Sequence, residues 1–164
     1  MLVRGIERDV LPTAQKYNMG VIPWSPLAGG WLSGRFGRGK ENVSRRAERI
    51  PERYDLHISG NQRKLEIVNE LAALAKDAGL SLIDMALAFV LEHPAISSAI
   101  IGPRTMEQLE SQLSAPSVRL DTGVLDQIDE IVPPGTNVNA ADSGWTPPVL
   151  TNLRHRRRKR EIER

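Results

Sequence analysis

The sequence predicts an α/β fold built on parallel strands. Two short apolar runs with strand-like composition, residues 21–26 and 96–101, alternate with segments of helical periodicity. Strands that alternate with helices pair in parallel. Only these two strands are expected among the 164 residues, and a parallel pair alone leaves both of its edges without a partner. We therefore expect an incomplete α/β unit.

The first predicted element is a helix that ends before residue 20. Its apolar face would hold Ile6, Val10, Leu11, Ala14 and Tyr17. Pro12 must then lie in or near the first turn, and Asn18-Met19-Gly20 is a stop signal with glycine after the C-cap. The first strand follows at residues 21–26, although Pro23 cannot donate to a sheet ladder and argues against a central strand.

A long loop-like stretch separates this strand from the next helix. Residues 27–60 carry five glycines between Gly29 and Gly39, together with several arginines. Loops of this length in compact domains usually have a function.

The second half of the chain returns to helical periodicity. A helix that ends at Ala78-Gly79 has an apolar stripe of Leu65, Val68, Leu71, Ala72 and Ala75. Capping-box patterns open the next two helices, at Ser81/Asp84 and Thr105/Gln108, and residues 96–101 form a buried strand between them. Asp121 caps a last helix, whose inward residues are Leu125, Ile128 and Ile131.

Composition excludes several classes of protein. With 40% hydrophobic and 26% charged residues, the chain has the composition of a globular protein. It has no cysteine, which removes disulfides, thiolate metal sites and a cysteine nucleophile, and no cluster has metal-ligand spacing. No apolar run approaches the roughly 18 residues of a membrane span, and the start of the chain lacks a signal-peptide core. We expect a cytoplasmic chain with no membrane contact.

The net charge of +2 is unevenly distributed. Residues 151–164 contain seven Arg or Lys and two Glu, a net charge of +5, so that the preceding residues carry −3. The basic character therefore belongs to one terminus, where no aromatic residue interleaves the arginines. We interpret that terminus as a solvated tail rather than a nucleic-acid-binding segment, and divide the chain into a unit at 1–132 and an extended tail at 133–164.

Two segments could bind a phosphorylated ligand. In the first, the strand 96–101 delivers the chain through Gly102 to the capped start of a helix, where free N–H groups and Arg104 suit a phosphate. The same pattern also occurs in ordinary strand-to-helix turns. In the second, Trp24 ends a strand and could offer its face to a planar ring, while the glycine-rich residues after it and Arg35 could wrap a phosphate chain. A lone tryptophan is, however, more often a core residue.

Together these segments resemble the C-terminal part of the aldo-keto reductase superfamily, in the branch of the potassium-channel β subunits and their bacterial relatives. The resemblance covers roughly residues 1–132. It is carried by Val21-Ile22-Pro23-Trp24-Ser25-Pro26-Leu27-Ala28 with Gly30, Ser33-Gly34-Arg35-Phe36, Ser44-Arg45, Ala86-Leu87-Ala88-Phe89-Val90-Leu91, Ile101-Gly102 and Glu107-Gln108-Leu109.

This resemblance implies two strands, with their helices, of an eight-stranded (β/α)8 TIM barrel that reduces carbonyls with NADPH. Trp24 would stack on the nicotinamide, and the pyrophosphate would be lined by Ser25, Pro26, Leu27, Ala28 and Gly30. Arg35 and Arg45 would lie in the loop over the cofactor, and Gly102 and Arg104 at the end of the family's eighth strand, with Arg104 near the adenosine 2′-phosphate. The adenine side would be held by Gln108, Ser111 and Gln112, although relatives usually carry an acid and then Asn at the last two positions.

The family's tyrosine, lysine, aspartate and histidine of catalysis lie in the first half of its barrel, and no counterpart is expected on this chain. Tyr54, Asp55, His57 and Lys64 provide the same residue types, but they fall in a loop and at a helix start with nothing to bring them together. The resemblance therefore implies the cofactor-binding fragment of an NADPH-dependent oxidoreductase acting on a small carbonyl substrate. The alternative is a non-catalytic binding module, or a truncated remnant, that needs an N-terminal half-barrel as its partner chain.

Overall fold

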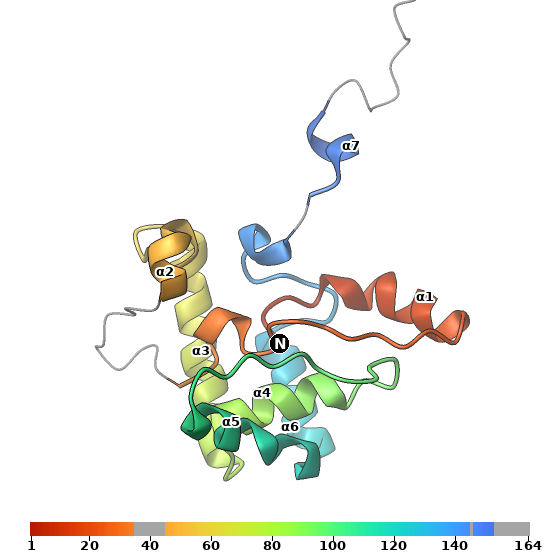
Figure 1. Cartoon of the computed structure of the whole chain (residues 1–164), viewed down its shortest axis with the longest axis vertical. Helices are drawn as coiled ribbons and strands as arrows, with labels where there is room; N and C mark the ends of the chain where they lie inside the picture. Colours follow the sequence, from red (N-terminus) through yellow and green to blue (C-terminus); the bar gives the residue numbers. More distant parts are fainter. Residues whose placement is uncertain (35–44, 145, 153–164) are drawn as a thin grey trace, which may run out of the picture.

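The computed structural model describes residues 1–34, 45–144 and 146–152. The helices are α1 (Val10–Lys16), α2 (Arg45–Arg49), α3 (Ser59–Asp77), α4 (Leu82–Leu91), α5 (Met106–Leu113), α6 (Thr122–Ile131) and α7 (Pro148–Thr151) (Figure 1). Short 3-10 turns lie at Gly5–Glu7, Ala28–Gly30, Pro51–Arg53, Ala115–Ser117 and Ala140–Ser143. None of the described helices is both long and apolar enough to cross a bilayer.

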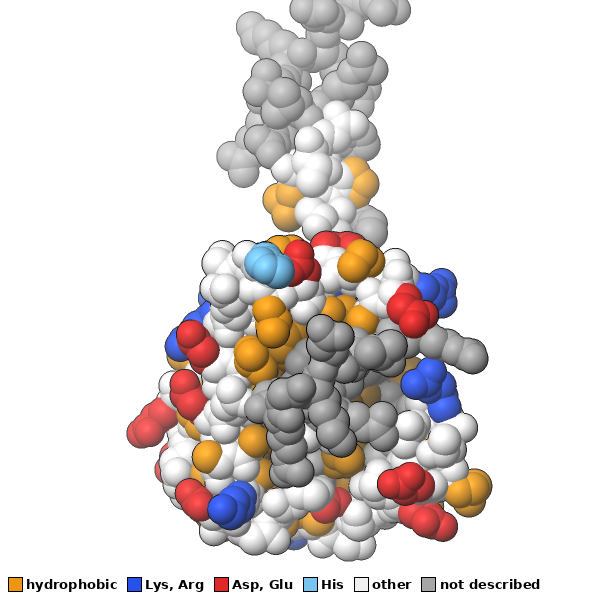
Figure 2. Space-filling model, turned by 90° about the vertical axis from the view of Figure 1, so that its left-hand side faces the viewer, with side chains coloured by type: hydrophobic (Ala, Val, Ile, Leu, Met, Phe, Trp, Pro, Cys, Tyr) orange, Lys and Arg blue, Asp and Glu red, His pale blue; other side chains and the backbone are white. Residues whose placement is uncertain are grey.

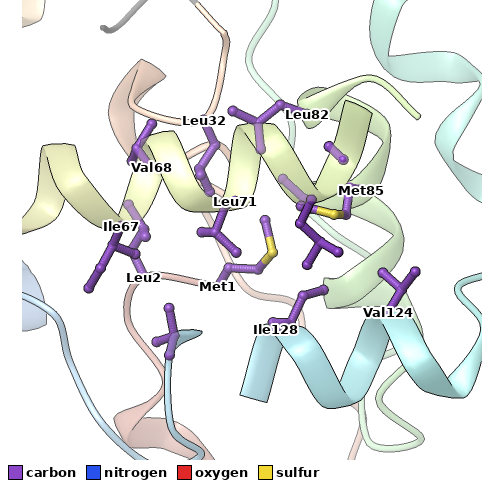
Figure 3. Packing of buried hydrophobic residues seen from close by; sticks show 14 of the residues in the cluster. Met1, Leu2, Leu32, Ile67, Val68, Leu71, Leu82, Met85, Val124 and Ile128 are labelled. Carbon is purple, nitrogen blue, oxygen red and sulfur yellow. The ribbon is translucent and has the colours of Figure 1, made fainter. Parts of the chain in front are cut away.

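The hydrophobic core lies between α3, α4 and α6 (Figure 3). Leu71, Met85 and Ile128 from these three helices are completely buried. The buried face of α3 consists of Asn61, Lys64, Ile67, Val68, Leu71, Leu74 and Ala75. The predicted stripe is therefore correct at its centre but rotated at its edges, where Leu65 and Ala72 are only partly buried.

The predicted stop after α3 and the predicted caps of α4, α5 and α6 are confirmed. The α3 helix closes with Gly79 at φ 69° and with Leu80 N–H donating to the carbonyl of Ala75 at 2.8 Å, which is the Schellman arrangement. The capping side chains of Ser81, Thr105 and Asp121 accept hydrogen bonds from the backbone three residues later. Each cap satisfies an N–H that has no partner inside its helix.

The two predicted strands are reduced to isolated bridges. Val21 pairs with Ile96 and Trp24 pairs with Ile100, both in parallel, so the predicted direction is correct while a continuous ladder is absent from the described residues. The bridged residues are three positions apart on the first segment, Val21 and Trp24, and four positions apart on the second, Ile96 and Ile100. The register therefore shifts by one residue between the two bridges. Pro23 lies between the bridges without an N–H to donate.

The first helix is shorter than predicted, and only Leu11 and Ala14 of its expected apolar face are buried. The left-handed residue after it is Asn18 at φ 52°, not Gly20. A Cβ at Gly20 would meet the side chain of Ser97, so the two strand-like segments lie close together there.

Part of the predicted tail packs on the start of the chain. Val3 and Asn137 form an antiparallel bridge, and Val138 N–H donates to the carbonyl of Leu2 at 3.0 Å. Residues 136–143 are thus held against the body rather than extended, whereas α7 stands away from it (Figure 1). The boundary at residue 132 remains a prediction.

Candidate functional site

Two chain segments leave the parallel pairing at its carboxyl end, after Trp24 and after Ile100, and we call this end the edge. Trp24 ends the first segment opposite Ile100 of the second, and Pro23 accepts the Ile100 N–H at 2.9 Å. Trp24 is 60% exposed, so it is not the core residue that a lone tryptophan usually is. The arrangement leaves an indole ring at the end of the strand with a turn directly behind it.

The turn after Trp24 has an unusual backbone. Ser25, Ala28, Gly29 and Gly30 all have positive φ, at 59°, 50°, 69° and 102°. It is closed by Ala28 N–H donating to Ser25 O at 2.8 Å and by Gly30 N–H donating to Leu27 O at 2.9 Å. Non-glycine residues in this region are strained, and such strain clusters at binding sites.

The second segment leads through Gly102 to the start of α5. Gly102 and Arg104 are exposed, and Thr105 caps the helix by accepting the Gln108 N–H at 3.2 Å. The Gln108 side-chain oxygen accepts the Arg104 N–H at 2.9 Å. These contacts fix the backbone at the helix start and leave the Arg104 guanidinium on the surface.

The residues predicted to hold adenine are engaged within α5 itself. Ser111 Oγ and Gln112 Nε2 both donate to the carbonyl of Gln108, at 2.9 Å and 2.7 Å. Gln112 is also buried. The side chains of Ser111 and Gln112 therefore bond to their own helix.

Two predicted arginines are not placed by the structure. Arg35 lies outside the described residues. Arg45 begins α2, but its side chain also lies outside what the structure describes.

A cavity of about 760 Å³ lies on one side of the turn. Four predicted residues line it, namely Trp24, Ser25, Pro26 and Ala28, together with Trp31, Tyr54 and Phe89. Gly102, Arg104 and α5 are not part of its lining. The predicted site is thus divided between a cavity on the Trp24 side and an open surface at α5.

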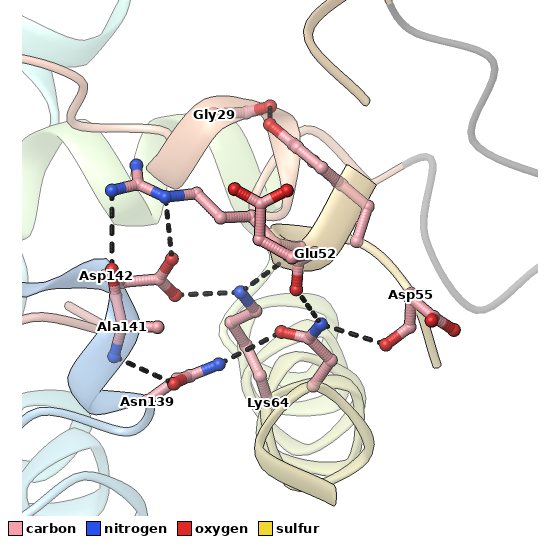
Figure 4. A network of polar contacts seen from close by, with 10 residues as sticks. Gly29, Glu52, Asp55, Lys64, Asn139, Ala141 and Asp142 are labelled. Atoms are coloured by element: carbon pink, nitrogen blue, oxygen red, sulfur yellow. Dashed lines mark hydrogen bonds and ion pairs between the residues drawn. The ribbon is translucent and has the colours of Figure 1, made fainter. Parts of the chain in front are cut away.

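Behind the turn lies a polar network that the sequence analysis missed (Figure 4). Lys64 Nζ donates to Asp142 Oδ2 at 2.7 Å and to the carbonyl of Arg53 at 3.1 Å. It also lies 4.3 Å from the ring centroid of Trp31. Burial lowers the pKa of Lys64, and the hydrogen bond that Lys64 donates to Asp142 opposes that shift. The available signal was position, because Lys64 lies three, four and seven residues before Ile67, Val68 and Leu71 on the buried face of α3.

The structure does not bring together the four residues of the types that the family uses in catalysis, namely Tyr54, Asp55, His57 and Lys64. Tyr54 and Lys64 face the interior network, with Tyr54 OH donating to Gly29 O at 3.0 Å. Asp55 and His57 pair with each other at 2.9 Å on the surface, where the backbone N–H of His57 lowers the pKa of Asp55. Within the described part of the chain, no three His, Asp or Glu residues are grouped as metal ligands.

Acidic and basic side chains are interspersed on the face of the molecule that Figure 2 shows. The strongly basic residues after Leu153 lie outside the described chain.

The turn after Trp24 lies beside Gly102, which leads to a capped helix, as the resemblance described above implies. The family model named Aldo/keto reductase family matches residues 1–133. The chain belongs to the aldo/keto reductase family. Among its relatives is an uncharacterized oxidoreductase from Bacillus subtilis, 39% identical over 133 residues, which cover 81% of this chain and 38% of the relative. A protein from Schizosaccharomyces pombe named for a voltage-gated potassium channel subunit beta is 30% identical over 129 residues, covering 77% and 38%.

The fold is similar to that of a glycerol dehydrogenase from Gluconobacter oxydans. The superposition has a TM-score of 0.65 with 25% sequence identity, and covers 77% of this chain and 38% of the dehydrogenase. The chain thus spans well under half the length of the relatives it matches.

Proposed function

We propose that this chain is the cofactor-binding portion of an NADPH-dependent aldo/keto reductase, and that its two bridged segments are strands of an incomplete (β/α)8 barrel. One observation carries the proposal. The parallel pairing of Trp24 with Ile100 sets the positive-φ turn and the Gly102–Thr105 turn at the same edge. Ligands of parallel α/β folds bind at the carboxyl ends of the strands.

Each part of the edge suits a different part of the cofactor. The exposed indole of Trp24 would stack on the nicotinamide, and the turn at residues 25–30 would line the pyrophosphate. Arg104 would pair with the 2′-phosphate, a doubly charged group that favours a guanidinium. NADPH held there would supply a hydride to a carbonyl carbon in the complete enzyme.

Among the described residues we expect none to protonate the carbonyl oxygen. Tyr54 lines the cavity beside Trp24, but its hydroxyl already donates to the carbonyl of Gly29. We therefore expect the isolated chain to bind NADPH without reducing small-molecule carbonyls. As part of a reductase without a membrane helix in its described residues, it would act in the cytoplasm.

Titration calorimetry with NADPH and NADH tests the proposal. The chain should bind NADPH more tightly than NADH. Arg104→Gln should lower the affinity for NADPH by about tenfold and leave the affinity for NADH nearly unchanged, because only NADPH loses a charge-assisted contact. Trp24→Ala should weaken both ligands by a similar factor. Arg119→Gln, an exposed arginine outside the edge, is the matched control. If the Arg104→Gln variant bound NADPH as tightly as the unaltered chain does, the assignment of Arg104 to the 2′-phosphate would be overturned.

The second candidate function is that of a non-catalytic module that pairs with a separate N-terminal half-barrel. The observation favouring it is that Ile22, Trp24 and Ile100 remain exposed beside two isolated bridges. The lateral side of an unpaired strand presents free backbone N–H and C=O groups, which can pair with a strand from another chain.

Sedimentation tests this candidate with the part of the Bacillus relative that this chain does not match. The two polypeptides should form a 1:1 complex that Ile22→Lys abolishes and Val149→Lys, at an exposed position on α7, preserves. Absence of a complex at micromolar concentrations would exclude it.

A further inference from the structure

The candidate cofactor turn is held from behind at two points. The first is the carbonyl of Gly29, which accepts the Tyr54 hydroxyl at 3.0 Å. The second is the ring of Trp31, the residue directly after the turn, which is 2% exposed. Trp31 and Tyr54 stack on each other, with centroids 6.0 Å apart and planes 9° apart. The two contact points therefore belong to one aromatic pair.

Lys64 fixes that aromatic pair from the start of α3. Its ammonium group has three N–H donors. One meets Asp142 and one meets the carbonyl of Arg53, while the ammonium also lies 4.3 Å from the Trp31 ring centroid, within the range of a cation–π contact. Because the side chain is 1% exposed, water does not screen these interactions.

The ion pair with Asp142 ties this network to the C-terminal segment. Asp142 also lies 3.9 Å from Arg53, and Arg53 Nη2 donates to the carbonyl of Ala141 at 3.3 Å. Asn139 donates to Asn61 at 3.0 Å one turn before Lys64. Residues 139–142 are thus bonded to the same end of α3 that supports the turn (Figure 4).

We propose that Lys64 and Tyr54 are positioning residues for the candidate cofactor turn, with Asp142 holding Lys64 in place from the C-terminal segment. The ammonium orients Trp31, Trp31 aligns Tyr54, and the Tyr54 hydroxyl fixes the carbonyl of Gly29. Asp142, which also lines the cavity, then influences nucleotide affinity through its ion pair with Lys64. The nucleotide part of this inference rests on the proposed function, whereas the effect on the turn does not.

The test is Tyr54→Phe, which removes one hydroxyl and keeps the stacked ring. Hydrogen exchange is measured at the amides of Gly30, Leu32 and Ser33, whose hydrogen bonds close the turn. Their exchange should become about two- to tenfold faster, the factor that corresponds to losing one neutral hydrogen bond. NADPH binding should weaken by a similar factor. Tyr17→Phe, on an exposed residue, is the matched control and should change neither quantity.

Lys64→Met tests the second support, with Arg63→Met on the same helix as its control. The Lys64 variant should accelerate exchange at the same amides and weaken NADPH by more than Tyr54→Phe does. Asp142→Asn should follow Lys64→Met, and Asp142→Glu should restore most of the affinity. If Lys64→Met fails to fold, Tyr54→Phe still decides the question.

The two proposals fail in different ways. Unchanged exchange and unchanged affinity in Tyr54→Phe, in a chain that binds NADPH, would overturn the positioning role and leave the proposed function intact. A chain that binds no NADPH would overturn the proposed function, and accelerated exchange in Tyr54→Phe would still support the hold on the turn.

Discussion

The helical core and the strand edge of this chain are stabilised in different ways. Leu71, Met85 and Ile128 are completely buried between helices, and every helix around them has a local cap or stop. At the edge, Trp24 and Ile100 are more than half exposed and meet in a single bridge.

The difference shows where this chain keeps its stability. A helix satisfies its hydrogen bonds within its own segment and needs only a neighbour for its apolar face. A strand forms its backbone hydrogen bonds with neighbouring strands, and the described residues supply few such neighbours. Helices therefore hold this chain together, and the edge that would bind a ligand is the part least supported by packing.

Acidification should give the largest change in the core region. Burial lowers the pKa of the Met1 amino group from 8.0 to about 5, and the nearby Arg4 charge adds to the shift. Between pH 5 and 8 the unfolded chain then binds more protons than the folded one, so stability is present above pH 8 and is lost as the pH falls. Urea unfolding should show a loss of roughly 4 kcal/mol between pH 8 and 5.

The control for this prediction is the chain acetylated at Met1, which has no amino group to titrate. Its stability should lose most of this pH dependence. Parallel pH profiles for the free and acetylated chains would contradict the burial of the amino group.

Truncation of a core side chain should have the next largest effect. Leu71→Ala should lower the free energy of unfolding by about 2–5 kcal/mol, because it leaves a cavity among α3, α4 and α6. Leu113→Ala, at a residue 60% exposed on α5, should change it by less than about 0.5 kcal/mol. Equal effects in urea denaturation would mean that α5 packs as tightly as the core helices.

Removing a helix cap should have an intermediate effect that differs between the two regions. Ser81→Ala should cost about 1 kcal/mol, because α4 is a core helix whose loss opens the core. Thr105→Ala removes the same kind of cap at the edge and should mainly speed amide exchange in α5. Thermal denaturation and exchange, measured on both variants, separate a global effect from a local one. Identical melting shifts would show that α5 unfolds together with the core.

The smallest effect is expected on the exposed edge. Ile100→Thr should change stability by less than about 0.5 kcal/mol, since this side chain is 54% exposed and threonine is also β-branched. A loss of 2 kcal/mol or more would show that another polypeptide or a second copy covers the edge in solution. Sedimentation of the unaltered chain would then identify which.

Most of the fold could be predicted because helices carry local signals. Gly79 and the caps at Ser81, Thr105 and Asp121 were all recognisable from their spacing. The strands could not be predicted to the same degree, since the one-residue shift between the two bridges depends on contacts between distant segments.

The candidate site could be predicted in its positions but not in its support. Trp24, the glycine turn and Arg104 follow from the sequence and from the family, and in the structure Trp24 and the turn line a cavity while Arg104 lies on the open surface at α5; their binding roles stay predictions. The hold on the turn was missed because Lys64 and Asp142 are 78 residues apart, and because residues 139–142 read as part of a tail. The inward orientation of Gln112 also depends on burial that spacing does not reveal.

The most direct test of the account is an amide NMR titration of the chain with NADPH. The account predicts that the signals of Gly29 and Gly30 shift together with those of Gly102 and Thr105, at one common affinity, because the turn and the start of α5 bind one ligand. Shifts at only one of these two places, or none at millimolar NADPH, would contradict it.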